Sequence, residues 1–548
     1  MLLRLFRRHP REWGPLEWLA VVGIGALVAA AITIAVTMAQ GPGRCGDDLR
    51  DIDGDCVGVT EEAFEADPGI ESLIGAVADE NARVKRDWED PPSGPRIPYV
   101  RIALMMPFTA DDHSAMTADM IRRGIAGALA AQRQANRFGG PHYQLLLAPD
   151  GRNLDQWEPV VDRLAELTKD TRAPLVGVTG IPSSTPETRK AIAALSRHSI
   201  PTVGPVITAA NMNSPYFFKT SPNNDQFARA LKLYLDRKPA RHRGFLVWDH
   251  RSEDVYSQNL RSVFERHFGD AYDLTNHNSN FTGTSGTDKG IPQRFTDAVQ
   301  KICNEKSDTV FFAGRDQDLP AFMERMAQEG SCGRTTTLRI LKVGIGLEPT
   351  LTGDAPRRWL DEARATIVDA SAVDPAWWAG KAKPKKALGR FLDSFEEIGA
   401  QHKLGKKALD DGYAVMYHDA FTLLAGAVDR TFAEINEGGK KAPEALSIPT
   451  KDDVYNTLII PSIAGDGCSS CLVGAGGTYG FEGPGRNDQW AVCKPVPVVE
   501  FPSSAAPAIR ARPASTAPTG TAPGTPAPPD ADRRPRAAVQ PVLRATPP

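Results

Sequence analysis

Apolar residues recur with two alternating spacings between residues 97 and 501. Short runs that are apolar at nearly every position predict buried strands, and longer segments with apolar residues three or four apart predict helices. The two kinds of segment alternate in two successive series, which is typical of parallel α/β sheets with helices on both faces and indicates two Rossmann-like lobes. The predicted strands are 100–108, 143–148, 175–179 and 201–207, then 244–249, 309–313 and 338–343, with helices at 114–136, 157–169, 186–197, 253–268, 294–304, 319–328 and 411–428.

The first 40 residues follow a different pattern. Four arginines precede an uncharged, largely apolar stretch over 18–40. At about 1.5 Å per residue, roughly 20 helical residues cross a ~30 Å hydrocarbon core. We therefore expect a basic cytoplasmic stub (1–17) and a single-pass transmembrane helix or signal anchor (18–40) in the cell membrane, with the remainder extracytoplasmic. The alternative is a cleaved signal peptide, although its apolar region usually spans only about 7–15 residues.

Two further segments flank the lobes. Residues 41–96 are rich in Gly, Asp and Glu and contain Cys45 and Cys56, which predicts an extracytoplasmic, disulfide-closed stalk with a helix over 69–84. Residues 502–548 are mostly Pro, Ala, Thr and Arg, with almost no large apolar side chain. Such a segment cannot offset its ordering entropy by burial, so it predicts a disordered tail.

Composition narrows the function classes. Hydrophobic residues make up 41% and charged residues 24% of the 548 residues, and the net charge of −3 provides no basic field for nucleic acid. The sequence contains no Walker loop, dinucleotide fingerprint or nucleophile elbow, so we expect neither an enzyme nor a cofactor.

The cysteines indicate an oxidising compartment, because several occur as local pairs beyond the apolar stretch. A metal site at Cys468, Cys471 and Cys493 is the alternative, but a closed site needs four ligands and no His lies near in sequence. We therefore expect disulfides and no metal, with at least one thiol left over. The disulfide candidates are Cys45, Cys56, Cys303, Cys332, Cys468, Cys471 and Cys493.

Four stretches carry a resemblance to a known family. They are YVRIALMMPFT, the strand–Ser-rich loop–helix–strand unit over 175–212, YFFKTSPNNDQFARALKLYL, and GGTYGFEGPGRNDQWAVCKPVPVVEF. Their order and spacing resemble the type I periplasmic binding proteins, in particular the branched-chain amino-acid (Leu/Ile/Val) substrate-binding proteins of ABC transporters. The resemblance implies two lobes, 97–215 with 371–474 and 216–370 with 475–501, joined by a three-crossing hinge near 215–220, 368–375 and 475–479.

Candidate ligand-binding residues in the first lobe follow two predicted strands. Ser183, Ser184 and Thr185 lie between a strand and a helix, where hydroxyls and free backbone N–H groups can bind a carboxylate. The alternative is an ordinary helix start, with Ser184 and Glu187 as a capping box. By resemblance, Val206 and Thr208 face the same ligand, although Thr208 also suits a simple turn.

The second lobe contributes Tyr256, Arg315 and Asp316. The ring of Tyr256 could cover the ligand, or it could be ordinary core. The sequence departs from the branched-chain pattern here, because that pattern more often has an aromatic residue in place of Arg315. The acidic residue expected for the ligand's ammonium is also missing, with Glu348 a little further on. These departures point to a more polar or anionic ligand.

The sequence thus predicts a membrane-anchored, extracytoplasmic protein that binds a small polar or amino-acid-like solute between two lobes for an ABC-type importer. Its partners would be that small molecule, the membrane and an ABC permease. The alternatives are a ligand sensor with a membrane signalling partner and a cell-envelope structural protein that uses the same fold.

Overall fold

The computed structural model describes most of residues 44–502 and the backbone of 509–511. The predicted cytoplasmic stub and membrane helix (1–40) lie outside the described residues, as do Cys468, Cys493 and nearly all of the predicted tail. Within the described part, no helix is long and apolar enough to cross a bilayer. The side chains described are those of residues 44–92, 96–111, 114, 116–137, 140–237, 243–284, 291–380, 384–405, 407–436, 446–460, 471–481, 489–492 and 494–502.

The first lobe is built on a parallel five-stranded sheet. Its strands are β3 (Tyr99–Met105), β4 (His142–Ala148), β5 (Leu175–Gly180), β6 (Thr202–Gly204) and β7 (Phe217–Lys219), in the order β4-β3-β5-β6-β7. The inner strands are almost entirely buried because helices cover both faces of the sheet, which explains their unbroken apolar runs. The covering helices are α4 (Ala118–Ala135), α5 (Trp157–Leu167), α6 (Pro186–Arg197), α14 (Lys386–Gln401), α15 (Tyr413–Ile435) and α16 (Lys451–Leu458).

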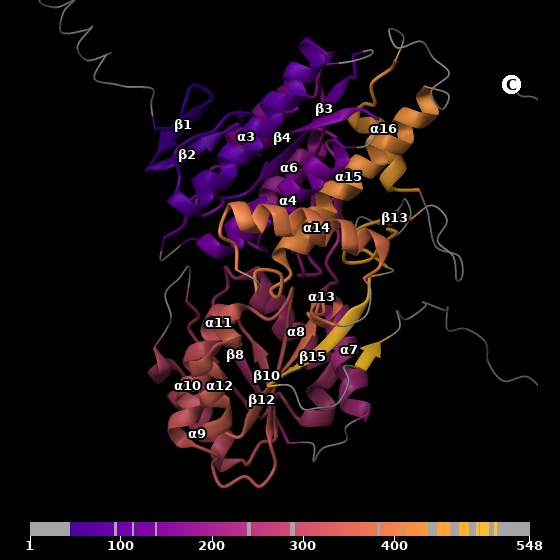
Figure 1. The fold of residues 1–548 in the computed structure, drawn as a ribbon. Coiled ribbons are helices and arrows are strands. Elements are labelled where there is room, and N and C mark those ends of the chain that lie inside the picture. The colour runs from indigo at the N-terminus through magenta and orange to yellow at the C-terminus, as the bar shows by residue number, and fades with distance from the viewer. Residues whose placement is uncertain are drawn as a thin grey trace, which may run out of the picture. The chain divides into compact units, whose positions relative to one another are not determined.

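Helices from late in the sequence complete this lobe. In Figure 1 the orange helices α14, α15 and α16 lie among the indigo and magenta elements of the first lobe. α15 packs closely on α4, and a Cβ at Gly127 would lie 2.1 Å from the carbonyl oxygen of Ala414. The glycine therefore permits the close approach of the two helices, which brings the start of α15 next to α4.

The segment before β3 packs against the first lobe. It forms the antiparallel hairpin of β1 (Leu49–Ile52) and β2 (Asp55–Gly58), closed by the Cys45–Cys56 disulfide, and the helix α3 (Pro68–Glu89). Asn81 of α3 accepts the backbone N–H of Leu145 at 2.8 Å and donates to its carbonyl at 2.9 Å. The segment predicted as a stalk is thus part of the packed first lobe, because the apolar face of α3 is buried against it.

The second lobe has a seven-stranded sheet in the order β16-β15-β12-β11-β10-β8-β9. The five strands β8 to β12 are parallel, whereas β15 and β16 add antiparallel strands at one edge. β16 lies in the segment predicted to be a disordered tail. These residues form a strand because they pair with β15. The strands are β8 (Gly244–Asp249), β9 (Asn278–Phe281), β10 (Thr309–Ala313), β11 (Leu338–Gly344), β12 (Ala365–Ser371), β15 (Val496–Phe501) and β16 (Ile509–Ala511).

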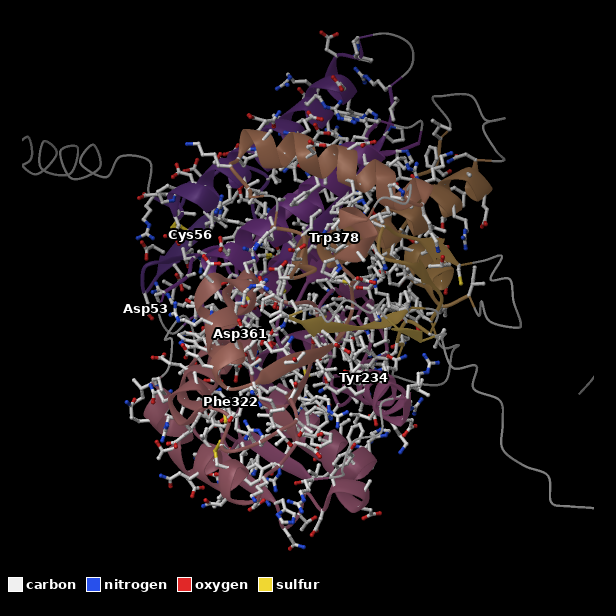
Figure 2. The ribbon with its side chains drawn as sticks, turned by 60° about the horizontal axis from the view of Figure 1, so that its bottom comes forward. Asp53, Cys56, Tyr234, Phe322, Asp361 and Trp378 are labelled. Atoms are coloured by element: carbon white, nitrogen blue, oxygen red, sulfur yellow. A yellow bond between two sulfur atoms is a disulfide. The ribbon has the colours of Figure 1, made fainter. Side chains whose placement is uncertain are left out.

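Helices and one disulfide enclose this second sheet. Tyr234, labelled in Figure 2, ties α7 to β15 by donating to Glu500 at 2.8 Å. Cys303 and Cys332 form a disulfide that links the ends of α9 and α10, and Cys471 is also disulfide-bonded. The helices are α7 (Asn224–Arg237), α8 (Val255–Tyr272), α9 (Thr296–Asn304), α10 (Leu319–Glu329), α11 (Pro349–Thr352) and α12 (Asp354–Glu362), with the short α13 (Ala376–Ala379) after β12.

The chain passes between the two sheets after β7, after β12 and before β15. The predicted third crossing, 475–479, instead belongs to the first lobe, where β13 (Leu472–Val473) and β14 (Thr478–Tyr479) form a hairpin against α15. The reason is the buried carboxylate of Asp419, which accepts the N–H groups of Ala475 at 2.6 Å and Gly476 at 2.8 Å.

Candidate functional site

A cavity lies between the carboxyl ends of the two sheets. Its volume is about 90 Å³, and a single water needs about 10–15 Å³ by the same kind of measure, so there is room for a small solute. Parallel sheets place their ligands at this end of their strands. The lining residues are Met120, Pro182, Ser183, Ser184, Val206, Thr208 and Tyr413 from the first lobe, and Tyr256, Arg315, Asp316, Gln317, Val343, Gly344, Ile345, Gly346 and Glu348 from the second.

The loop between β5 and α6 supplies a buried hydroxyl to the cavity. Ser183 is 5% exposed, and its Oγ has no hydrogen-bond partner in the described structure. Leaving a buried polar group unsatisfied costs about 1–3 kcal/mol. An incoming polar group could satisfy it, which makes Ser183 suited to contact a ligand.

The start of α6 differs from the predicted capping box. Thr185, not Ser184, is the N-cap, because its hydroxyl accepts the backbone N–H of Thr188 at 3.1 Å. Glu187 instead accepts from Trp157 at 3.2 Å and Lys190 at 2.7 Å. Thr185 is used as the cap and does not line the cavity. Ser184 is not used as the cap, and it lines the cavity.

The loop after β6 forms the adjoining part of the first-lobe wall. Val206 and Thr208 both line the cavity, and Thr208 is 4% exposed. The carbonyl of Thr208 accepts the backbone N–H of Asn224 at 2.9 Å. This bond fixes the loop against the first residue of α7, so the threonine is held in place beside the cavity.

Tyr256, in the first turn of α8, lines the cavity and is also held within the second lobe. Its hydroxyl donates to the carbonyl of Val343 at 2.8 Å, which fixes the ring within the second lobe, and the ring lines the cavity. The guanidinium of Arg315 lies 5.6 Å from the ring centre. The aromatic wall is therefore rigid and already carries one cation.

The positive charge of Arg315 is compensated inside the second lobe. Arg315 donates to both carboxylate oxygens of Asp254, at 2.7 and 2.9 Å. Burial opposes ionisation of Asp254, but Arg315 holds the pKa of its carboxyl below the usual range. The pair consequently presents little net charge to the cavity, so Arg315 alone gives no strong preference for an anion.

A buried lysine of β11 organises the carboxylates beneath the cavity. Lys342 lies 3.0 Å from Asp316 and 2.9 Å from Asp369. Burial raises the pKa of Asp316 to about 6, although Lys342 opposes the rise. Lys342 was not among the predicted site residues, yet a lysine inside the apolar run LRILKVG is the kind of residue that marks a buried ion pair.

Glu348 is a further acidic residue of the cavity wall, and Asp411 of the first lobe lies near it without lining the cavity. Glu348, the N-cap of α11 in the second lobe, is 9% exposed and forms no ion pair among the described residues. Asp411, just before α15 in the first lobe, is paired with Arg123 at 2.6 Å. Burial, together with Asp316 and Asp411, raises the pKa of Glu348 to about 8.

The two lobes touch beside the cavity. The side-chain oxygen of Asn259 in α8 accepts the backbone N–H of Ala210 from the first lobe at 3.2 Å. A Cβ at Gly346 would lie 2.5 Å from the carbonyl oxygen of Asp410, so only glycine fits where the second-lobe loop meets the first lobe. Trp378, labelled in Figure 2, donates to Asp410 at 3.0 Å and helps to hold this segment.

Seven of the eight residues predicted for the site line one cavity, and Thr185 is the exception. Met120, Gln317 and Tyr413 are among the wall residues that were not predicted from the sequence. Tyr413 comes from the start of α15, which is distant in sequence from the other wall residues. Only the packing of α15 on α4 brings it there, so no local motif could have identified it.

The chain has the α/β fold of the type I periplasmic binding proteins, with parallel sheets in two lobes. No family model matches the sequence, and no curated protein matches it either.

Particular solved structures share the fold at low sequence identity. An ABC transporter substrate-binding protein from Desulfitobacterium hafniense, in complex with Leu, gives a TM-score of 0.51 at 15% identity over 75% of this chain and 100% of that chain. A leucine-binding protein from Thermotoga maritima gives 0.51 at 16% over 73% and 94%. A solute-binding protein of an ABC transporter from Rhodopseudomonas palustris, in complex with p-hydroxybenzoic acid, gives 0.51 at 14% over 76% and 96%. These neighbours are solute-binding proteins rather than enzymes.

Proposed function

We propose that this chain is a membrane-anchored, extracytoplasmic solute-binding protein that binds a small polar or amino-acid-like ligand for an ABC-type importer. The observation that carries the proposal is a cavity walled by the strand ends of both lobes, with the unpartnered hydroxyl of Ser183 at its surface. A site divided between two lobes gains most of its ligand contacts only when the lobes come together. Ligand binding therefore favours the closed arrangement.

The first-lobe wall suits a hydrogen-bond acceptor on the ligand. The hydroxyls of Ser183 and Ser184 stand beside the start of α6, where backbone N–H groups and the helix dipole favour negative charge. On the opposite wall, Tyr256 supplies a fixed aromatic face. A solute with one polar end and a compact body would satisfy both walls.

Two observations support the proposed location. The Cys45–Cys56 and Cys303–Cys332 disulfides are typical of an oxidising compartment. The apolar stretch over 18–40 has the length and basic flank of an anchor. Labelling thiols of protein from intact cells with a maleimide, with and without prior reduction, tests the location. Labelling of Cys303 and Cys332 without reduction would contradict it.

Importer delivery is the most specific part of the proposal. Its support is the fold shared with proteins whose structures are described as ABC transporter substrate-binding proteins. Affinity purification of the full chain from its own membranes, with and without solute, tests it. Recovery of a permease and its ATPase would support delivery of the solute to an importer. Recovery of a membrane signalling protein instead would favour a function as a ligand sensor.

Ligand binding itself is tested by a thermal-shift screen of amino acids and related solutes on the full chain in detergent. A ligand present at 100 times its Kd stabilises the folded state by about 2.7 kcal/mol, which gives a measurable shift. Thr208→Ala and Tyr256→Ala should weaken binding of any stabilising solute, and the exposed Thr336→Ala provides the matched control. Unchanged affinity in both site variants would show that the solute does not bind in this cavity.

A further inference from the structure

We infer that the ligand of this cavity carries a positive charge, because two acidic side chains of the second lobe, Asp316 and Glu348, line the cavity, and Glu348 has no ion-pair partner among the described residues. The inference rests on the proposed function, since it names the chemical class of the solute. That class is a small amine, guanidine or quaternary ammonium compound.

Every cation beside the cavity already has a carboxylate partner. Arg123 is paired with Asp411, Arg315 with Asp254, and Lys342 with both Asp316 and Asp369. Glu348 adds a further carboxylate with no ion pair in the described structure. With Arg251, which lies 2.6 Å from Asp249 and 3.4 Å from Asp254, four cations stand against six carboxylates: Asp249, Asp254, Asp316, Asp369, Asp411 and Glu348.

Glu348 is the acid of the cavity wall whose charge has the least compensation. Its burial is the main cost of ionising it, Asp316 and Asp411 add to that cost, and Lys342 and Arg123 oppose it. A cation placed beside Glu348 reduces this cost, and in its absence Glu348 binds a proton. The pKa of about 8 for Glu348 is consistent with such proton uptake.

Two features distinguish this cavity from an ordinary surface cluster of acids. The buried, unpartnered hydroxyl of Ser183 opens onto the same cavity from the opposite wall. The ring of Tyr413 also lines it, and an aromatic face attracts a cation when water is excluded. A solute could therefore place its cationic group near Glu348 and Tyr413 and its polar end near Ser183.

The test compares solutes of different charge on the full chain in detergent at pH 7. The probes are putrescine, arginine, leucine and glutamate, measured by thermal shift and isothermal titration calorimetry at matched ionic strength. We expect putrescine or arginine to raise the melting midpoint and leucine and glutamate to leave it unchanged. Stabilisation by leucine or glutamate alone would overturn the charge inference and leave the proposed function standing. A lack of response to all four probes would count against both.

A variant pair assigns the effect to Glu348. Glu348→Gln keeps the shape of the side chain and should weaken binding of the cationic probe by about tenfold or more, which corresponds to loss of one charge-assisted contact. Glu362→Gln removes a half-exposed carboxylate of α12 and should leave the affinity unchanged. Equal affinity for wild type and Glu348→Gln would overturn the inference.

Proton release provides a readout that a purely structural role would not alter. If the cation replaces a proton on Glu348, binding at pH 7 releases a proton. Calorimetry in two buffers of different ionisation enthalpy measures that release. Wild type should release a fraction of a proton and Glu348→Gln clearly less. Cation binding with no proton release in wild type would contradict the role of Glu348.

Discussion

Arg315 and Asp254 form a two-point ion pair at 2.7 and 2.9 Å, next to the cavity and under the ring of Tyr256. Asp254 is also the N-cap of α8, where it accepts the backbone N–H of Ser257 at 3.3 Å. One carboxylate thus both starts the helix that presents Tyr256 and neutralises the arginine beside it. The second-lobe wall is therefore formed before any ligand arrives.

Breaking this pair should destabilise the fold. Asp254→Ala leaves the guanidinium without its partner in a largely buried position and should lower the free energy of unfolding by about 3–5 kcal/mol. Urea unfolding measures the loss. Glu166→Ala, which breaks an exposed pair with Arg163, should cost less than about 1 kcal/mol. Equal losses in the two variants would show that the buried pair has no special role.

The hydrogen bond between Asn259 and Ala210 should slow ligand release. It crosses from the second lobe to the first, so Asn259→Ala removes one contact that exists only when the lobes meet. We expect dissociation of the stabilising solute to become about 2- to 10-fold faster with little change in association, measured by stopped-flow tryptophan fluorescence. Asn276→Ala, which removes an exposed local bond to Asp273, is the control. An unchanged dissociation rate would exclude the contact as a closing element.

Glu348 should make the ligand-free fold less stable as the pH rises. Its pKa is raised to about 8 in the folded state from 4.5, so the folded chain binds more protons between these values and loses stability as pH increases through them. The groups around it are Asp316, Asp411, Lys342 and Arg123, with Tyr413 alongside.

The loss between pH 5 and pH 8 should be about 3–4 kcal/mol. Glu348→Gln should reduce this pH dependence, and Glu362→Gln should not. Urea midpoints at the two pH values measure it. Parallel pH profiles for wild type and Glu348→Gln would refute the assignment.

Asp419 should produce the opposite dependence. Burial works against its ionisation, but hydrogen bonds from His418 and Tyr479 and the charge of Lys494 lower its pKa below 3.8. The carboxylate therefore contributes stability above about pH 4, and this contribution is lost as the pH falls through the folded pKa. Asp419→Asn should be less stable than wild type at pH 7, and the difference should shrink toward pH 3. Thermal midpoints across this range measure it, with Asp393→Asn on α14 as the control.

The alternation of apolar runs was enough to predict seven strands of the two lobes, because parallel strands covered on both faces are apolar throughout, but β7, β9 and β12 were not predicted. β8 and β10 have the predicted bounds. Local sequence could not reveal that β15 and β16 join the second sheet antiparallel. The family resemblance placed the third crossing too early, because the attachment of Ala475 and Gly476 depends on Asp419, which lies far away in sequence.

The candidate site was predictable where a loop follows a strand, and Ser183 and Thr208 are examples. Charges were harder to assign. Arg315 reads as a free cation in the sequence, whereas the folded chain pairs it with Asp254 from the start of another helix. Lys342 and Asp411 gain their importance from neighbours that only the tertiary structure supplies.

The segment before β3 bears on the lobe motion that the proposed function requires. Thr60 pairs with Leu147 of the edge strand β4, and α3 packs against the same strand, so the described part of this segment is attached to the first lobe. Any N-terminal attachment to a membrane would therefore hold the first lobe stationary. Under the proposed function, the second lobe would swing while its neighbour stays fixed, and a membrane partner would detect the solute as a change in the position of that one lobe.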